Sequence, residues 1–383
     1  MTVPAKGSAA RPKVLHLHST FAAGGKELRA VQLMNAFGDA LDHTVVSGQP
    51  EHKAAREYIA RGVPVQFPED FPSLTGFPGP ARLAALARAM KRYDLVLTYN
   101  WGAMDAVMAH AVFGEAFKLP PLIHHEDGFN QDEALQLKAP RNWYRRIALG
   151  RAYALVVPST VLEGIAQSVW NQPRTRIRRI ANGIDTAKFG GQPQPGAFRV
   201  VKREGERWIG TIAGLRAVKQ LPMLVKACAN LPEYWHLVIL GEGPEREAIM
   251  AAASALDIND RVHLPGAIRN PASVIGLFDI FALSSQSEQF PLSVVEAMAA
   301  GLPIAAPDVG DIKVMVADPN RPYIAVRGDP EALAVMLEEL TADGALRAEL
   351  GRANRDKARA HFDHSHMIAA YRSLYAEALR RDF

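Results

Sequence analysis

The chain has 383 residues, of which 48% are hydrophobic and 22% are charged, and its 44 basic and 40 acidic residues give a formal net charge of +4. This average composition excludes a disordered or collagen-like chain, and the small charge excess gives little support to a polyanionic partner. The length favours two domains, each with its own core. The single cysteine, Cys228, excludes an intrachain disulfide, which suits a reducing cytoplasm.

The first half of the chain predicts an α/β domain over residues 13–190. Residues 1–12 are small and basic without the apolar core of a signal peptide, so we expect a flexible leader. Short apolar stretches then alternate with helical ones, which is typical of a parallel sheet covered on both faces. The expected strands lie at residues 13–19, 43–48, 63–67, 94–99, 121–126, 154–159 and 177–185.

A linker rich in Gly, Pro and Gln at residues 191–196 separates this domain from a second one, over residues 197–361. The second domain repeats the α/β pattern, and a C-terminal helix in residues 362–383 is expected to cross back to the first domain. Two doubly wound sheets joined in this way place the carboxyl ends of their strands around one cleft, where a ligand would bind. The expected strands lie at residues 207–215, 236–243, 261–268, 280–285 and 303–310.

The segment SEQFPLSVVEAMAAGLP, residues 287–303, carries two acids in an apolar run. Pro291 suits the start of a helix that runs to Ala300, and Gly301 ends it. The free N–H groups of the first turn can bind an anion such as a phosphate. Glu296 either accepts hydrogen bonds from ribose hydroxyls or only complements the helix dipole, and Glu288 is then either a ligand contact or an exposed loop acid.

Glu288 and Glu296 match the E-x7-E signature of retaining GT-B glycosyltransferases, particularly the GT4 family, also called glycosyltransferase group 1. The segments NGID, GLRAVKQLPMLVKA, LVILGEGPER and VHLPGAI resemble blocks of the same family in the same order. The sequence thus resembles a GT4 enzyme over residues 180–310 and, more loosely, over the first half. The resemblance implies a GT-B fold, in which two Rossmann-like domains face each other across a cleft.

The resemblance also implies roles for particular residues. Glu288 would hold hydroxyls of the donor sugar and Glu296 the ribose, while Arg216 and Lys219 would neutralise the departing diphosphate. On their own, Arg216 and Lys219 would be solvated charges and the Gly24–Gly25 pair a tight turn. The other implied donor contacts are the backbone of Phe290, Pro291, Leu292 and Ser293, Gly24 and Gly25 across the cleft, and Ile268 at the nucleobase.

The segment LIHHEDGFNQDE, residues 122–133, is dense in titratable groups. Strand alternation sends His124 and Glu126 to one face and His125 and Asp127 to the other. Family members often have a histidine before the glycine at this point, where this chain has Asp127. We expect either that His125 and Asp127 contact the substrate, with acceptor-binding roles for His124, Asn130 and Glu133, or that a histidine packs in the core and Asp127–Gly128 forms a turn.

A second departure lies in DVGDIKVMV, residues 308–316. Where the family commonly has G-G-x-x-E, this chain has Gly310 and Asp311, and Val314 replaces the acid. This weakens a detailed transfer of donor contacts from the family to this chain.

The resemblance predicts transfer of a sugar from a nucleoside diphosphate sugar, UDP favoured over GDP, to a glycan or lipid acceptor of the cell envelope, with retention. No metal and no further cofactor are expected, since the basic pair and the helix N-terminus supply positive charge. An epimerase of the same fold and a non-catalytic partner subunit are the alternatives.

Residues 137–153 mix five cations with Trp143 and Tyr144 on a predicted helix. Such a helix either lies on an anionic membrane surface or is a solvated helix with its aromatic residues in the core. The protein is therefore expected in the cytoplasm, free or peripheral at the inner face of the cytoplasmic membrane. Nucleic-acid binding is disfavoured because no nucleic-acid module is recognisable.

Overall fold

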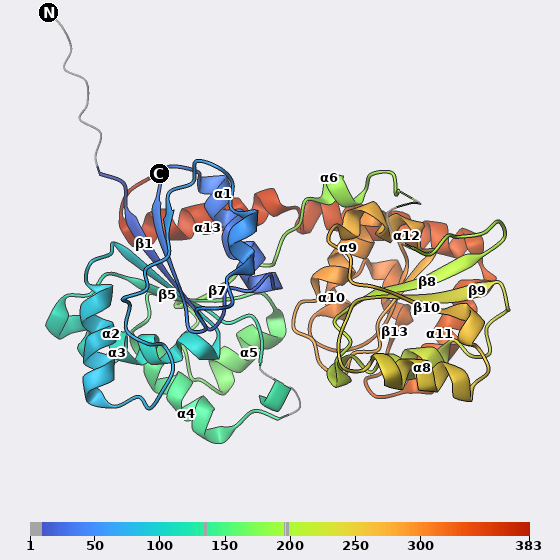
Figure 1. Ribbon diagram of the computed structural model, residues 1–383, viewed down its shortest axis with the longest axis horizontal. Helices are drawn as coiled ribbons and strands as arrows, with labels where there is room; N and C mark the ends of the chain where they lie inside the picture. Colours follow the sequence, from blue (N-terminus) through green and yellow to red (C-terminus); the bar gives the residue numbers. More distant parts are fainter. Residues whose placement is uncertain (1–9, 130, 134–135, 195, 197–198) are drawn as a thin grey trace, which may run out of the picture.

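A computed structural model of the protein describes residues 10–129, 131–133, 136–194, 196 and 199–383 (Figure 1). Two α/β domains lie side by side, and each is built on one parallel sheet. The predicted fold class is confirmed. None of the helices in the described part of the chain is long and apolar enough to cross a membrane.

The N-terminal domain contains a parallel sheet with the strand order β3-β2-β1-β4-β5-β6-β7 in its described residues. All five residues of β4 are buried, as expected for a strand with helices on both faces. The strands are β1 (Lys13–His18), β2 (Asp42–Ser47), β3 (Val65–Gln66), β4 (Leu95–Tyr99), β5 (Leu122–His125), β6 (Ala154–Val157) and β7 (Ile177–Arg179).

Helices cover both faces of this sheet. The helices α2 (Pro80–Met90), α3 (Met104–Phe117) and α5 (Thr160–Ser168) pack on one face, and α1 (Gly25–Phe37) packs on the other. Two further helices, α4 (Ala139–Ala148) and α6 (Thr186–Phe189), follow β5 and β7. Every strand expected in this half is present, although β3 and β7 are short.

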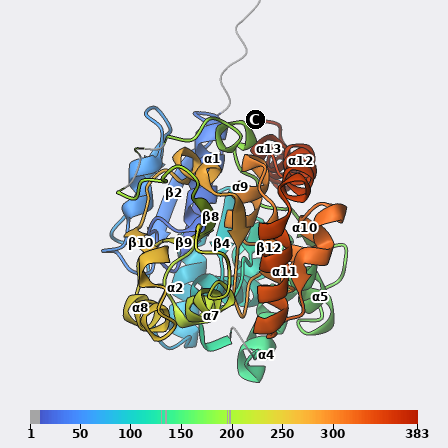
Figure 2. The same ribbon diagram turned by 90° about the vertical axis from the view of Figure 1, so that its right-hand side faces the viewer.

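The C-terminal domain repeats the same winding, with the strand order β10-β9-β8-β11-β12-β13. The strands are β8 (Arg207–Ile212), β9 (Trp235–Leu240), β10 (Val262–Gly266), β11 (Ile280–Ala282), β12 (Ile304–Pro307) and β13 (Ile324–Ala325). The helices are α7 (Leu221–Ala227), α8 (Arg246–Ala255), α9 (Leu292–Ala300), α10 (Ile312–Met315), α11 (Pro330–Ala342) and α12 (Gly344–His361). Figure 2 shows α9 and α12 above the strands and α7 and α8 below them.

The chain crosses between the domains twice, and the two crossings lie against each other. Ile184 donates its N–H to the carbonyl of Phe362 at 3.0 Å, and His364 donates to the carbonyl of Ile184 at 2.8 Å. A Cβ on Gly183 would lie 2.7 Å from the Cα of His364, so only glycine permits this close approach. These two crossings form one compact connection between the domains.

After the second crossing, α13 (His364–Leu379) runs along the N-terminal domain (Figure 1). Its residues Met367, Tyr371 and Tyr375 are buried in the same core as residues of β1, β4 and α1. A helix that follows the C-terminal domain in sequence therefore completes the core of the N-terminal domain.

Candidate active site

In both sheets the chain first adds strands on one side of the first strand and then continues on its other side. The reversal lies between β1 and β4 in one domain and between β8 and β11 in the other. Ligands of such sheets bind at this point, beyond the carboxyl ends of the strands. The loops after β8 and β11 carry Lys219 and Glu288, and the turn after β1 carries Gly24 and Gly25.

A cavity of about 230 Å³ lies between the domains at this point. One wall comes from the N-terminal domain, just after β5, and the other from the loops after β8 and β11. The lining residues are Asp127, Gly128 and Phe129 on the first wall, and Arg216, Val218, Lys219, Ser287, Glu288, Gln289 and Phe290 on the second.

The second wall is organised around an ion pair between Lys219 and Glu288. Ser284 donates its hydroxyl to the carbonyl of Lys219 at 2.8 Å, so the loop after β8 is tied to the loop after β11. Arg216 is exposed at the same cavity. The structure thus brings together the three charged residues that the sequence resemblance groups, at the junction of two loops.

The helix α9 begins after Pro291 and ends at Gly301, which has a left-handed backbone (φ 82°), as the sequence predicts. Glu296 lies one turn into this helix and lines a second cavity, of about 450 Å³, with Lys188, Gly25 and Leu292. Burial raises the pKa of Glu296 to about 7, and Lys188 acts in the opposite direction.

Gly25 lies directly across from α9. A Cβ built on Gly25 would contact Leu292 Cδ1 at 3.7 Å, so the turn after β1 faces the start of α9. Gly24 is the residue before α1 and provides no side-chain cap. Ser293 lies in the first turn of α9, while Phe290 packs edge-to-face on Phe362 with the ring centroids 5.6 Å apart.

Ile268, predicted to lie at the nucleobase, and the glycines of the segment GEGPER belong to the same domain as this wall. Ile268 is partly buried and packs against the core of the C-terminal domain. Gly241 and Gly243 approach the loop after β8 so closely that a Cβ would lie 1.9 Å from the Ala213 oxygen and 2.4 Å from the Leu215 oxygen. The glycines of GEGPER therefore make a tight turn against this loop.

Asp127 is the charged residue that the N-terminal domain presents to the cavity. The Arg29 guanidinium forms a bidentate ion pair with its carboxylate, one bond being Nη2 to Oδ2 at 2.9 Å. Asp127 also donates its N–H to Asn100 Oδ1 at 2.8 Å, and Arg29 donates to Asn182 Oδ1 at 2.8 Å. Asp127 is thus held in a fixed orientation at the cleft.

Arg29 is 5% exposed, and burial acts to lower its pKa. Asp127, with smaller contributions from Tyr371 and Tyr99, opposes burial, and the net effect raises the pKa of Arg29 above its ordinary value, so the guanidinium is charged. The pair is therefore a buried charge on α1 compensated by a carboxylate at the edge of the cavity.

The two histidines of this segment lie in the core. His124 is fully buried, and its Nδ1 lies 2.8 Å from Thr98 Oγ1. His125 is 1% exposed, its Nδ1 lies 3.1 Å from the Thr98 carbonyl, and its ring stacks on Tyr99 at 4.6 Å. The expected substrate contact of His125 and acceptor contact of His124 are therefore wrong in this structure, because both side chains pack inside the sheet layer.

Burial lowers the pKa of His125 well below its ordinary value, with Arg29 acting in the same direction, so this ring is neutral. The predicted alternation along the strand is confirmed on one face, where His124 Nε2 lies 3.7 Å from a carboxylate oxygen of Glu126. The prediction that His124 and Glu126 share a face is therefore correct, but of this segment's predicted contacts in the described residues only Asp127 lines the cavity, and neither histidine does.

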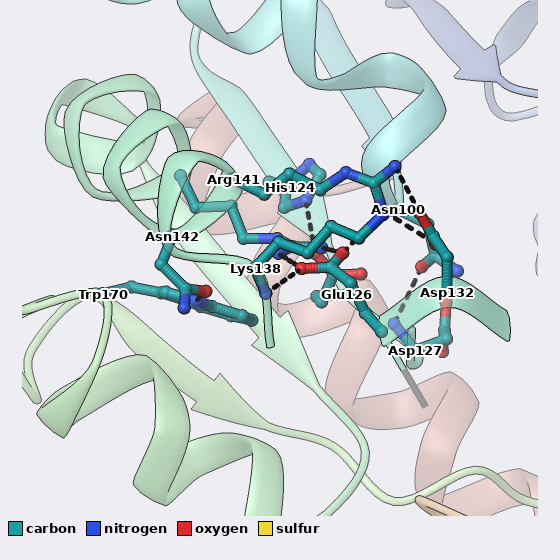
Figure 3. Close-up of polar contacts among 11 residues, drawn as sticks. Asn100, His124, Glu126, Asp127, Asp132, Lys138, Arg141, Asn142 and Trp170 are labelled. Carbon is teal, nitrogen blue, oxygen red and sulfur yellow. Dashed lines mark hydrogen bonds and ion pairs between the residues drawn. The ribbon is translucent and has the colours of Figure 1, made fainter. Parts of the chain in front are cut away.

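Glu133 was expected to contact the acceptor and instead belongs to a buried cluster, of which Figure 3 labels Glu126 and Arg141. Its two carboxylate oxygens accept hydrogen bonds from Arg145 at 3.1 Å each, and Arg141 donates to it at 2.9 Å. Arg145 also bonds Glu126 at 3.3 Å, and all three of Glu126, Glu133 and Arg145 are at most 1% exposed. The acceptor contact assigned to Asn130 lies outside the described residues.

The guanidinium of Arg145 lies 4.9 to 5.4 Å from the ring centroids of Trp101, Phe129 and Trp170. These rings exclude water from the Arg145 ion pairs. The cluster therefore fixes α4 to the end of β5, next to Asp127.

Sequence reasoning missed three residues of the site. Arg29 gave no signal, since a single arginine in an amphipathic helix is usually solvated. Asn100 follows β4 with φ 54° and ψ −171°, outside the left-handed helical region in which asparagine is enriched, so no local pattern indicated it. Asp311 was noticed only as a departure from the family pattern.

Comparison with known proteins gives the family. Residues 23–188 match the family model described as Glycosyltransferase Family 4, and residues 197–357 match the one described as Glycosyl transferases group 1. The chain belongs to this glycosyltransferase family. The two matches together span both domains, and the second includes Lys219, Glu288 and Glu296.

Individual relatives of this glycosyltransferase are distant. The N-acetyl-alpha-D-glucosaminyl L-malate synthase of Bacillus anthracis is 29% identical over 289 residues, 73% of each chain. The lipopolysaccharide core biosynthesis glycosyltransferase LpsE of Rhizobium meliloti is 27% identical over 153 residues, 40% of this chain and 45% of that protein. The crystal structure of Anabaena HepE in complex with UDP and glucose superimposes with a TM-score of 0.77 at 18% identity, covering 96% of this chain and 100% of that one.

Proposed function

We propose that this glycosyltransferase moves a sugar from a UDP-sugar to a glycan or lipid acceptor of the cell envelope, with retention of the anomeric configuration. The observation that carries the proposal is the cavity between the domains, where the Lys219–Glu288 pair lies on one wall and Asp127 on the other. The relatives named above supply the substrate classes, since one acts in lipopolysaccharide core synthesis and one fold relative binds UDP and glucose.

The donor would replace the Lys219–Glu288 ion pair with contacts of its own. Lys219 and the exposed Arg216 turn to the diphosphate, and Glu288 is freed to accept hydrogen bonds from the sugar hydroxyls. Glu296 accepts bonds from the ribose in the adjoining cavity. Positive charge at the leaving diphosphate then comes from the Lys219 and Arg216 side chains and the N-terminus of α9, in place of a metal ion.

The chemistry of the transfer needs little covalent help from the protein. The transition state resembles an oxocarbenium ion, and the departing phosphate oxygen helps to take the proton of the incoming hydroxyl on the same face of the sugar. Asp127, oriented by Arg29, accepts a hydrogen bond from the acceptor and places it for attack. The protein thus acts by positioning and by stabilising charge.

Thermal-shift measurements with UDP, GDP and ADP test the donor, because a ligand that binds only the folded state raises its melting temperature. We expect UDP to give the largest shift. Incubation with UDP-sugars and an envelope extract, followed by mass spectrometry, then tests the transfer. A glycosylated acceptor supports the proposal, whereas an isomerised donor without such a product would indicate an epimerase, and neither product would indicate a non-catalytic subunit.

We also propose that α4 contacts an anionic membrane surface. Trp143 and Ile147, four residues apart and 63% and 54% exposed, share a helix face with Arg146, whose guanidinium lies 5.5 Å from the Trp143 ring centroid. Tyr144 instead points inward and donates to Asp105 at 2.7 Å. The other four cations of residues 137–153 pair with carboxylates, so the membrane contact depends on the apolar pair and Arg146.

Sedimentation with vesicles of phosphatidylglycerol and phosphatidylcholine tests this contact. We expect binding to the anionic vesicles by the native protein and a loss of binding in Trp143→Ser/Ile147→Ser. Equal sedimentation of the native and variant proteins would contradict the proposal.

A further inference from the structure

The side chain of Asp311 forms a contact between the two domains. It belongs to the C-terminal domain, directly before α10, and is 4% exposed. Its carboxylate accepts three hydrogen bonds from the N-terminal domain, from Thr160 N at 2.6 Å, Thr160 Oγ1 at 2.7 Å and Val161 N at 3.2 Å. An aspartate at this position usually caps its own helix, but Asp311 makes no side-chain bond to α10.

The partner of Asp311 is the start of α5, a helix of the opposite domain. The first N–H groups of a helix have no partner within it, and a carboxylate there is stabilised by the helix dipole. Ser159 caps the N–H of Leu162 at 3.1 Å, which leaves those of Thr160 and Val161 for Asp311. The capping of α5 is therefore shared between residues of both domains.

The backbone around Asp311 also contacts the second wall of the cavity, the wall that carries Glu288. Asp311 donates its N–H to the Gln289 carbonyl at 3.1 Å. Gly310 has a φ of 59°, and a Cβ on it would lie 2.6 Å from the carbonyl oxygens of both Glu288 and Gln289. The backbone of Gly310 and Asp311 is therefore packed directly against that of Glu288 and Gln289.

We infer that Asp311 is a positioning residue, which fixes the Glu288 loop at a set distance from the Asp127 wall by capping α5 across the cleft. The inference rests on the proposed function for the roles of Glu288 and Asp127. The capping contact forms only when the two walls face each other as they do here, and separating the walls transfers the Thr160 and Val161 N–H groups to water. Asp311 thus favours the arrangement in which donor and acceptor sites meet.

Four single variants and the double variant Asp311→Ala/Thr160→Val test the inference, with amide hydrogen exchange at Thr160 and Val161 as one readout and kinetics as the other. Asp311→Ala removes all three bonds, Thr160→Val removes only the hydroxyl bond, and Thr160→Ser keeps all of them. Asp308→Ala is the matched control, because Asp308 lies in the same loop and its exposed carboxylate pairs with the exposed Lys313, at 3.6 Å.

In Asp311→Ala we expect exchange at Thr160 and Val161 to accelerate at least tenfold, kcat to fall about tenfold and the Kd for UDP to change less than about twofold. Thr160→Val should lower kcat about threefold, and the double variant should be no slower than Asp311→Ala, because both changes remove one contact. Thr160→Ser and Asp308→Ala should match the native protein in both readouts.

Unchanged exchange in Asp311→Ala would overturn the contact, and faster exchange with an unchanged kcat would overturn the positioning role. A loss of UDP binding equal to the loss of kcat would also overturn it, since a general structural defect would explain both. Absence of transfer with every donor tested would instead overturn the proposed function, and the exchange result would still decide whether Asp311 joins the domains.

Discussion

The two walls of the cleft are built in different ways. On the C-terminal wall, Lys219 and Glu288 are partly exposed residues on two loops, and they pair with each other where a donor would lie. On the N-terminal wall, Asp127 reaches the cavity from a buried network in which Arg29 and Asn100 orient it. The comparison teaches that the charged residues of the C-terminal wall would have to change partners when a donor binds, whereas the position of Asp127 on the N-terminal wall is set by the fold itself.

The largest expected effect concerns the fold of the acceptor wall. Arg145→Met leaves Glu126 buried without its cation and leaves Glu133 with Arg141 alone, and breaking a buried pair in this way costs about 3–5 kcal/mol. We expect the free energy of unfolding in urea to fall by that amount. Arg146→Met, on the same helix but at the surface, should change it by less than about 0.5 kcal/mol. A similar small loss in both variants would show that the cluster does not stabilise this wall.

The next prediction compares substitutions on the two walls, which should change different kinetic quantities. Lys219→Ala removes a cation from the leaving diphosphate, so kcat should fall by about 10²- to 10³-fold and UDP should bind more weakly. Asp127→Asn keeps the shape of the side chain but loses its charge, so the KM for the acceptor should rise about tenfold while UDP affinity stays unchanged. Steady-state kinetics gives kcat and the KM for the acceptor, and inhibition by UDP in competition with the donor gives the UDP affinity. Weaker UDP binding in Asp127→Asn would mean that the walls are not separate.

The smallest effect is a pH dependence on the donor wall. Glu296 has a pKa of about 7 because of burial, so about half of this carboxyl is ionised at pH 7. If Glu296 holds the ribose as proposed, the ionised form would accept hydrogen bonds from both hydroxyls, and donor binding would favour this form. UDP affinity should therefore rise severalfold between pH 6 and pH 8, as the carboxyl loses its proton.

Isothermal titration of UDP at several pH values measures this dependence. In Glu296→Gln the side chain cannot titrate, so the rise in affinity between pH 6 and pH 8 should disappear. Glu247→Gln, at an exposed position of α8, is the control and should keep the native profile. A native profile in Glu296→Gln would exclude this carboxyl from the ribose site.

Most of the fold was predictable because parallel strands and amphipathic helices have distinct hydrophobic periods. The helix from Leu292 to Ala300 was predictable at both ends, since Pro291 marks its start and Gly301 its end. The strand β13 (Ile324–Ala325) was missed because two buried residues give no period. The E-x7-E signature of the family also agrees with the structure, in which Glu288 lies on the loop before α9 and Glu296 lies on α9.

The acceptor wall was less predictable for a physical reason. Whether a polar side chain at a strand end is buried depends on partners far away in sequence, and Arg29 and Asp127 are separated by 98 positions. His125 and Asp127 share a strand face, yet the first packs against Tyr99 and only the second reaches the cavity. The contact of Asp311 with Thr160 spans 151 positions, and no local pattern could indicate it.

The position of α13 has a consequence for biosynthesis. The side chains of Tyr371 and Tyr375 fill the face of the N-terminal sheet that also holds Phe37 and Tyr99. During translation, β1 and α1 leave the ribosome more than 300 residues before these tyrosines, so the first domain to emerge has an open core while the second domain is completed. The domain that begins to fold first is therefore the last to finish, and residues 13–190 expressed without α13 would expose an apolar surface to the chaperones of the cell.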